Sequence, residues 1–186
     1  FIDTVILAGR SPTEELVLGA ELPGPQDPML AGMHLKWIAS ALKSSKADFL
    51  LVGGHYPVYS IGSHGPTPLL ELLLKPLLEE AGAHYLCGHD HDLEHIDDGH
   101  GVTYIVTGSG GAGCCYDDSN RDKVPKGSVK FAATGKDGSG HQSMPFPILG
   151  GFASVRLETE SMEIVLHAHN GTELHRTGKI PRRQLS

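Results

Sequence analysis

The chain has 186 residues, and 22 acidic against 15 basic side chains give it a formal net charge of −7 at pH 7. This mildly acidic balance argues against a nucleic acid or an anionic membrane surface as its partner. No apolar run approaches the length needed to cross a bilayer. The unusual number is 12 histidines, because histidine is a common metal ligand near neutral pH.

The first half of the chain alternates strand and helix patterns. Residues 1–7 (FIDTVIL) are interpreted as a strand, and because it starts abruptly at Phe1 we expect the chain to be a piece of a longer protein. After a polar loop, residues 29–46 carry apolar side chains at helical spacing, which predicts an amphipathic helix. Residues 48–54 (DFLLVGG) form a short apolar run closed by two glycines, which is typical of a buried strand.

The same alternation continues through residue 108. Residues 68–82 predict a second helix, kinked or restarted at Pro76. Residues 83–88 (AHYLCG) and 102–108 (VTYIVTG) predict two more buried strands, each closed by glycine. This order of elements predicts an α/β fold with a partly parallel sheet and helices outside it.

The last third changes to the two-residue alternation of antiparallel strands. Such strands are predicted over residues 152–158, 162–168 and 173–179. Asn170-Gly171 predicts a hairpin turn between the last two. With Thr172 it also forms a glycosylation sequon that secretion would make usable, but the turn is the preferred explanation. Residues 117–151 are polar and rich in glycine, so we expect them to cross the surface as a loop.

The three cysteines show no CxxC spacing, so the sequence encodes neither a disulfide framework nor a zinc knuckle. Cys87 lies in an apolar run and is interpreted as a small buried residue. Cys114 and Cys115, in a glycine-rich loop, are interpreted as two loop thiols.

Chemistry-bearing side chains follow the glycines that end the predicted strands, where functional loops of open α/β sheets lie. His55 follows Gly54, and His89 follows Gly88. In extended geometry residues two apart point to the same side, so His89 and His91 would face one cavity with His55. The ions of a two-metal centre lie about 3.5–4 Å apart, which such imidazoles can span. Other histidines receive no role: His34, His84, His100, His141, His167, His169 and His175.

The motifs Gly-His-Tyr-Pro (54–57) and Gly-His-Asp-His (88–91) resemble those of the purple acid phosphatases, within the metallophosphoesterase superfamily. The likeness is greatest to the animal-type tartrate-resistant acid phosphatases (type 5). It extends in order through LKWIASAL, KVPKGSVKF, GGFASV and IPRR, and so covers almost the whole chain. The resemblance implies a metallophosphoesterase-type β-sandwich flanked by helices, of which residues 1–186 are the C-terminal portion of a single calcineurin-like domain.

The resemblance also implies an activity, the hydrolysis of phosphate monoesters by a metal-bound hydroxide at a dinuclear centre. His55 and His89 would bind the divalent ion (Fe(II), Zn or Mn), and His91 would bind Fe(III). His64 would position substrate or supply a proton to the leaving group, and Asp90 would orient a neighbouring side chain. Phosphoproteins, nucleotides or small phosphoesters are the implied substrates, and the implied location is secreted or lysosomal.

Half of the family's metal ligands have no counterpart in the sequence. They come from an early aspartate, a Gly-Asp motif followed by a tyrosine, and a Gly-Asn-His motif, all in the family's N-terminal half. The chain has no Gly-Asp dipeptide, and neither Asn120 nor Asn170 precedes a histidine. We therefore expect the absent N-terminal half of the same domain to be its partner, and without it an exposed sheet edge and apolar surface.

Two alternatives stay open. One is a phosphodiesterase or phosphoprotein phosphatase of the same superfamily, because the core ligands are shared. The other is a truncated, non-catalytic chain that binds one metal ion or a protein partner.

Overall fold

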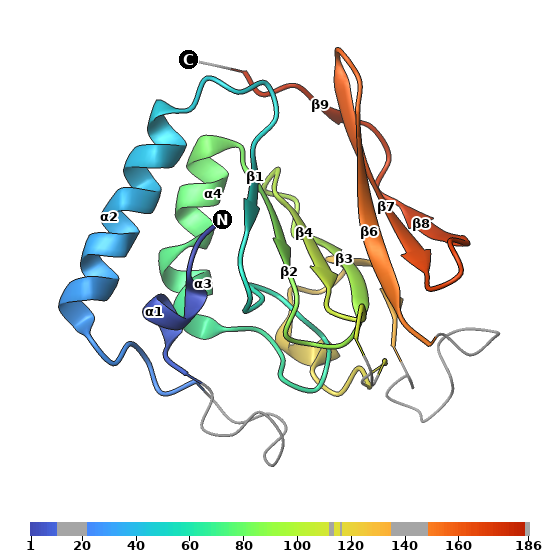
Figure 1. Ribbon diagram of the computed structural model, residues 1–186, viewed down its shortest axis with the longest axis horizontal. Helices are drawn as coiled ribbons and strands as arrows, with labels where there is room; N and C mark the ends of the chain where they lie inside the picture. The colour runs from blue at the N-terminus through green and yellow to red at the C-terminus, as the bar shows by residue number, and fades with distance from the viewer. Residues whose placement is uncertain (11–21, 112–113, 116, 135–148, 185–186) are drawn as a thin grey trace.

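The computed structural model describes residues 1–10, 22–111, 114–115, 117–134 and 149–184. Figure 1 shows three layers, in which helices cover one face of a five-stranded sheet and a four-stranded sheet covers the other. The α/β sandwich with flanking helices expected from the sequence is confirmed.

The five-stranded sheet has the order β1-β2-β4-β3-β5. Its strands are β1 (Leu51–Gly53), β2 (His84–Cys87), β3 (Leu93–Asp97), β4 (Thr103–Thr107) and β5 (Val129–Ala133). β1, β2 and β4 are parallel, as the alternation of strands and helices predicts, whereas β3 pairs antiparallel with both β4 and β5.

The helices follow the predicted pattern and have recognisable ends. α2 (Pro28–Ser44) begins at Asp27, whose side chain accepts hydrogen bonds from two backbone N–H groups of the first turn. The second predicted helix is divided into α3 (Pro68–Leu73) and α4 (Lys75–Ala81), so it restarts next to Pro76. α4 ends at Gly82, whose φ of 58° suits a glycine.

The second sheet contains the three predicted antiparallel strands and one short addition. They are β6 (Gly151–Leu157), β7 (Ser161–Ala168), β8 (Glu173–Arg176) and β9 (Ile180–Pro181). Both β8 and β9 pair with β7. The predicted hairpin turn is confirmed, since Asn170 Oδ1 accepts a hydrogen bond from the Thr172 N–H between β7 and β8.

The five-stranded sheet is buried on both faces, which explains why its strands are almost continuously apolar. Tyr104 and Val106 belong to the hydrophobic cluster that includes the helix residues. Ile105, between them, belongs to the cluster shared with Ile164 of β7. Successive side chains of β4 thus pack into two different cores.

The prediction of a strand over residues 1–7 is wrong. The structure places helix α1 at Thr4–Ala8. Asp3 caps it, accepting hydrogen bonds from the Val5 and Ile6 N–H groups, and this local capping outweighs the apolar pattern. Only Ile2 makes a strand-like contact, donating its N–H to the carbonyl of Gly53 at the end of β1.

Two strands of the five-stranded sheet were not predicted. β5 lies within the stretch expected to be a surface loop, while residues 135–148 of that stretch lie outside the described part of the chain. β3 follows the histidine motif directly, and its polar residues Glu94 and His95 are buried. His95 Nδ1 lies 2.8 Å from His175 Nε2 of β8, so a partner far away in sequence accounts for this buried polar side chain.

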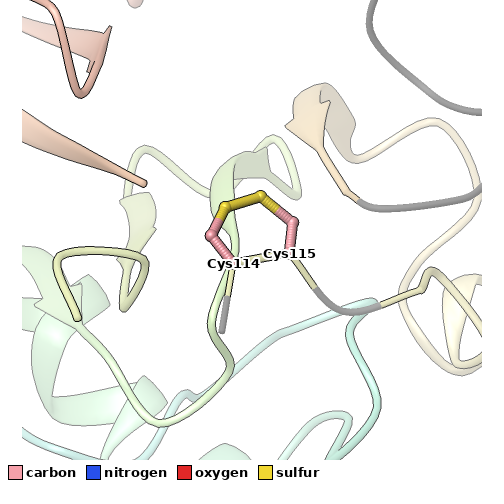
Figure 2. Close-up of a disulfide and its surroundings, with 2 residues drawn as sticks. All are labelled: Cys114 and Cys115. Atoms are coloured by element: carbon pink, nitrogen blue, oxygen red, sulfur yellow. A yellow bond between two sulfur atoms is a disulfide. The ribbon is translucent and has the colours of Figure 1, made fainter. Parts of the chain in front are cut away.

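The interpretation of Cys114 and Cys115 as two loop thiols is also wrong. The structure joins them in a disulfide between adjacent residues (Figure 2). Cys87 is a buried free thiol, as predicted.

Most exposed large apolar side chains of the described residues lie in two regions, and Leu72 of α3 is exposed apart from them. The first region comprises the N-terminal residue, α1 and α2, with Phe1, Val5, Met29, Leu30, Met33 and Trp37. The second comprises β6 and the segment just before it, with Leu149, Phe152, Val155 and Leu157. β1 also forms one edge of the five-stranded sheet. The expected exposed apolar surface is therefore present among the described residues, whereas the β1 edge is partly covered, since Ile2 donates to the Gly53 carbonyl. Within the described residues, no helix combines the length and apolar character needed to span a bilayer.

Candidate metal and phosphate site

The two histidine motifs lie side by side where β1 and β2 end. Gly54 donates its N–H to the carbonyl of Leu86, and Gly88 donates its N–H to the carbonyl of His55. Position 54 requires glycine, because a Cβ there would lie 2.2 Å from the Tyr85 hydroxyl oxygen. The parallel pairing of β1 with β2 thus delivers both motifs to the same end of the sheet.

Helix α1 fixes the first motif. Thr4 Oγ1 accepts hydrogen bonds from the N–H groups of His55, at 3.3 Å, and Tyr56, at 3.0 Å. The Tyr85 hydroxyl donates to the Tyr56 carbonyl at 2.8 Å. The backbone that carries His55 is therefore held from two sides, although the His55 side chain itself is exposed.

The second motif is bent rather than extended. His89 has a φ of 67°, and the Asp90 N–H donates to the Gly88 carbonyl at 2.9 Å, which is the hydrogen-bond pattern of a classic γ-turn, a rare and strained conformation. The extended geometry assumed for His89 and His91 is therefore wrong. The turn directs the carboxylate of Asp90 into the interior, where it is completely buried.

Three imidazoles gather at this turn. His89 Nδ1 lies 3.2 Å from His55 Nε2, and the His64 ring centroid lies 4.2 Å from that of His89. Tyr56 packs edge-on against His89 with ring centroids 4.7 Å apart. Burial, followed by the neighbouring His64 and His55, lowers the pKa of His89 to about 3. His89 therefore presents neutral nitrogens, the form in which imidazole binds metal.

The distance between the His55 and His89 nitrogens fits two ligands of one ion. Zinc binds imidazole nitrogen at about 2.0–2.1 Å with tetrahedral geometry, so two such nitrogens lie about 3.3 Å apart. The 3.2 Å separation found here matches this value. The separation of these two nitrogens is the one that two ligands of a single cation would have.

His91 is not grouped with them in the same way. It lies close enough to His89 to lower the pKa of that ring electrostatically. Yet within the part of the chain that the structure describes, no three His, Cys, Asp or Glu side chains converge in an arrangement that could hold a metal ion. The roles of His91, His55 and His89 as metal ligands remain predictions.

Asp90 connects the histidine cluster to the interior. Its Oδ1 lies 2.7 Å from His64 Nδ1 and accepts the His64 backbone N–H at 2.9 Å. Its Oδ2 accepts hydrogen bonds from the Ser60 hydroxyl and, at 3.3 Å, from the Gly65 N–H. Burial raises the pKa of Asp90, but the hydrogen bonds from His64 and Ser60 outweigh it, and the net shift is downward. Asp90 is therefore an ionised carboxylate.

Ser60 links Asp90 to a second buried carboxyl group. Ser60 Oγ lies 3.0 Å from Glu94 Oε1, and Glu94 Oε2 accepts the Ile61 N–H at 3.1 Å. Burial, and then the charge of Asp90, raises the pKa of Glu94 to about 8. At neutral pH Asp90 is charged and Glu94 keeps its proton, because two adjacent buried carboxylates cannot both be ionised cheaply.

A cavity of about 510 Å³ adjoins this cluster, and His64 and His89 form part of its wall. Leu22, Pro66 and Leu69 contribute apolar surface, and Lys123 contributes the positive charge. The imidazoles and the Lys123 cation could bind an anionic group. The apolar wall could contact the rest of the molecule that bears this group.

Sequence reasoning did not find Ser60, Glu94 or Lys123. Ser60 lies in a loop with no motif of its own, and Glu94 reads as an ordinary polar position of a strand. Lys123 comes from the 3-10 turn Arg121–Lys123, more than 30 residues after the last histidine motif. The KVPKGSVKF segment that resembles the family begins at Lys123, and this was the one available signal.

Known proteins match the chain over nearly its whole length. It is 38% identical over 185 residues to human tartrate-resistant acid phosphatase type 5, a match that covers 98% of this chain and 52% of that protein. The pig protein of the same name is 37% identical over 188 residues, covering 100% and 50%. Purple acid phosphatase 17 of Arabidopsis thaliana is 33% identical over 143 residues, covering 76% and 38%. The chain thus spans about half the length of the animal relatives that it matches.

The fold has a solved counterpart. GAP50, the anchor in the inner membrane complex of Plasmodium, superposes with a TM-score of 0.66 over 98% of this chain and 48% of that chain, at 20% identity. No protein-family model matches the chain. The Plasmodium structure supports the fold alone, whereas the identities to the animal and plant phosphatases show descent. The chain belongs to the purple acid phosphatase family, and it corresponds to about half of a tartrate-resistant type 5 member.

Proposed function

We propose that the protein containing this chain is a metal-dependent acid phosphatase that hydrolyses phosphate monoesters. The observation that carries the proposal is the approach of His55 Nε2 to His89 Nδ1, 3.2 Å apart, beside His64 and an open cavity. The names of the matched relatives support the same activity.

His55 and His89 would hold the divalent ion of a dinuclear centre, and His91 would contribute to the ferric ion. When bound, two cations would neutralise the charge of a phosphate dianion and lower the pKa of bound water. The other ligands would come from the N-terminal half of the domain, of which residues 1–186 form the C-terminal portion. That half would also cover the β1 edge or the exposed apolar residues. Their presence on this chain supports the N-terminal half as the missing partner.

His64 would supply a proton to the leaving-group oxygen. Its Nδ1 is engaged by Asp90, so Nε2 is the nitrogen with which it would meet a substrate. The cavity beside it would take the alcohol portion of the ester against Leu22, Pro66 and Leu69, with Lys123 attracting the phosphate. Family membership favours a secreted or lysosomal location, where an acid optimum is useful.

The test is hydrolysis of p-nitrophenyl phosphate at pH 5 by the full-length protein, with iron and zinc content measured on the same sample. Loss of most of the activity in His55→Ala and His89→Ala, together with loss of one metal ion, supports the proposal. Glu160→Gln, a side chain 77% exposed, is the matched control and should be fully active. A metal-loaded protein that binds phosphate but turns over no ester would be non-catalytic. Preference for bis(p-nitrophenyl) phosphate would indicate a phosphodiesterase instead.

A further inference from the structure

Asp90 is completely buried, and both of its oxygens accept hydrogen bonds from one short loop. Three of these bonds go to His64 and Gly65. The loop that carries His64 therefore closes around the carboxylate, and the His64 ring can rotate only by giving up a 2.7 Å contact.

We propose that Asp90 is the positioning residue of His64, and that it holds the imidazole in the tautomer with hydrogen on Nδ1 and with Nε2 directed to the substrate. Both oxygens of Asp90 act as hydrogen-bond acceptors, from the Ser60 hydroxyl and from the His64 and Gly65 backbone N–H groups. The His64 nitrogen beside it must therefore carry hydrogen, which leaves the lone pair of the neutral ring on Nε2. Nε2 is then the nitrogen that takes up a proton to give the imidazolium, and it is this proton that His64 would pass to the leaving-group oxygen. Only the catalytic meaning of this arrangement rests on the proposed phosphatase activity.

Ser60 and Glu94 complete the arrangement behind Asp90. The Ser60 hydroxyl donates to Asp90 Oδ2, and Ser60 Oγ also lies 3.0 Å from Glu94 Oε1. Ser60 Oγ accepts the Gly62 N–H at 3.0 Å, so this hydroxyl is itself held in place. Asp90 is thus bonded by Ser60 at Oδ2 and by His64 at Oδ1.

The position also explains two glycines. A Cβ at Gly62 would lie 2.8 Å from Asp90 Cγ and 2.3 Å from Asp92 Oδ2. A Cβ at Gly108 would lie 1.9 Å from the Asp90 carbonyl oxygen. Both glycines let backbone approach Asp90 as closely as possible, so the surroundings of this carboxylate are fixed on several sides.

The test reads the tautomer directly, without using activity. In the ¹⁵N-labelled chain at pH 8, two-bond nitrogen–hydrogen correlations distinguish a protonated from an unprotonated ring nitrogen. We expect His64 to show a protonated Nδ1 and an unprotonated Nε2. Asp90→Ala should move His64 to the Nε2–H form or to a mixture. Asp90→Asn should restore the Nδ1–H form, because its amide oxygen can still accept from Nδ1 and from the His64 N–H. Glu160→Gln is the charge-matched control and should change nothing.

Wild-type protein with His64 in the Nε2–H form would overturn the proposal, and so would a folded Asp90→Ala variant that keeps the Nδ1–H form. If Asp90→Ala does not fold, the wild-type and Asp90→Asn spectra still decide. In the full-length phosphatase, Asp90→Ala should reduce kcat by about 10²-fold or more with little change in KM, because a positioned proton donor contributes about that factor. An inactive full-length wild type whose His64 shows the Nδ1–H form would refute the phosphatase but not the positioning.

Discussion

The buried carboxyl group of Glu94 makes the stability of the chain depend on pH. Its pKa is raised from 4.5 to about 8, first by burial and then by the charge of Asp90. Between these values the unfolded chain has lost the proton that the folded chain keeps. The unfolded state therefore binds fewer protons, and the free energy of unfolding falls as pH rises through this window. From pH 6.5 to 8 the loss amounts to about 2 kcal/mol, at about 1.4 kcal/mol per pH unit.

Glu94→Gln should remove this loss, because glutamine copies the protonated acid. Its amide oxygen can accept the Ile61 N–H as Oε2 does, and its amide nitrogen can donate to Ser60 Oγ. Urea denaturation at pH 6.5, 7.25 and 8 measures the free energy of unfolding and the denaturant slope together. The buried histidines, whose pKa values are lowered, contribute the same rise in stability with pH to both proteins. The free energy of unfolding of the wild type should therefore fall by about 2 kcal/mol relative to that of the variant over this range. Glu160→Gln, on an exposed side chain, should retain the wild-type slope.

The reasoning is refuted if the free energies of unfolding of Glu94→Gln and the wild type change by the same amount between pH 6.5 and 8. Glu94 would then be ionised in the folded state at neutral pH, beside the ionised Asp90.

Three further changes have defined outcomes. Gly108→Ala should cost about 1–3 kcal/mol or more in urea denaturation, because its Cβ meets the Asp90 carbonyl, while Gly111→Ala, with nothing within 4 Å, should stay within about 0.5 kcal/mol. Burial lowers the pKa of His84 to about 4, so stability is lost as pH falls from 6.5 toward 4, and a urea pH series should show a smaller loss in His84→Asn, whose side-chain oxygen replaces Nδ1 as acceptor of the Thr103 N–H. Met33→Lys, on an exposed side chain of α2, should reduce the self-association of the chain measured by light scattering. Unchanged association would show that the chain does not associate through the exposed face of α2.

The elements that the sequence predicts well are those whose signals are local. The helix at residues 29–46 combines a capping aspartate with apolar side chains at helical spacing, and the strands near 51, 84 and 103 are apolar runs closed by glycine. β3 was missed because its buried Glu94 and His95 depend on Ser60 and His175, which are distant in sequence. Nothing in the sequence of residues 93–97 (LEHID) indicates those partners.

The site divides in the same manner. His55 and His89 could be predicted to meet, because two glycine-histidine motifs follow neighbouring parallel strands. The turn at His89 could not be predicted, since nothing in the sequence indicates a positive φ at a non-glycine residue. This turn leaves the His89 ring beside His55 and directs the Asp90 carboxylate to His64. The two contacts therefore depend on one backbone angle.

The most direct measurement of the central claim is anomalous X-ray diffraction from crystals of the protein loaded with zinc. One anomalous peak should lie about 2.0–2.1 Å from both His55 Nε2 and His89 Nδ1, in place of the hydrogen bond that now joins them. A peak that avoids both rings, or crystals with zinc bound elsewhere while His55 and His89 remain hydrogen-bonded, would contradict the assignment of this end of the sheet as the metal site.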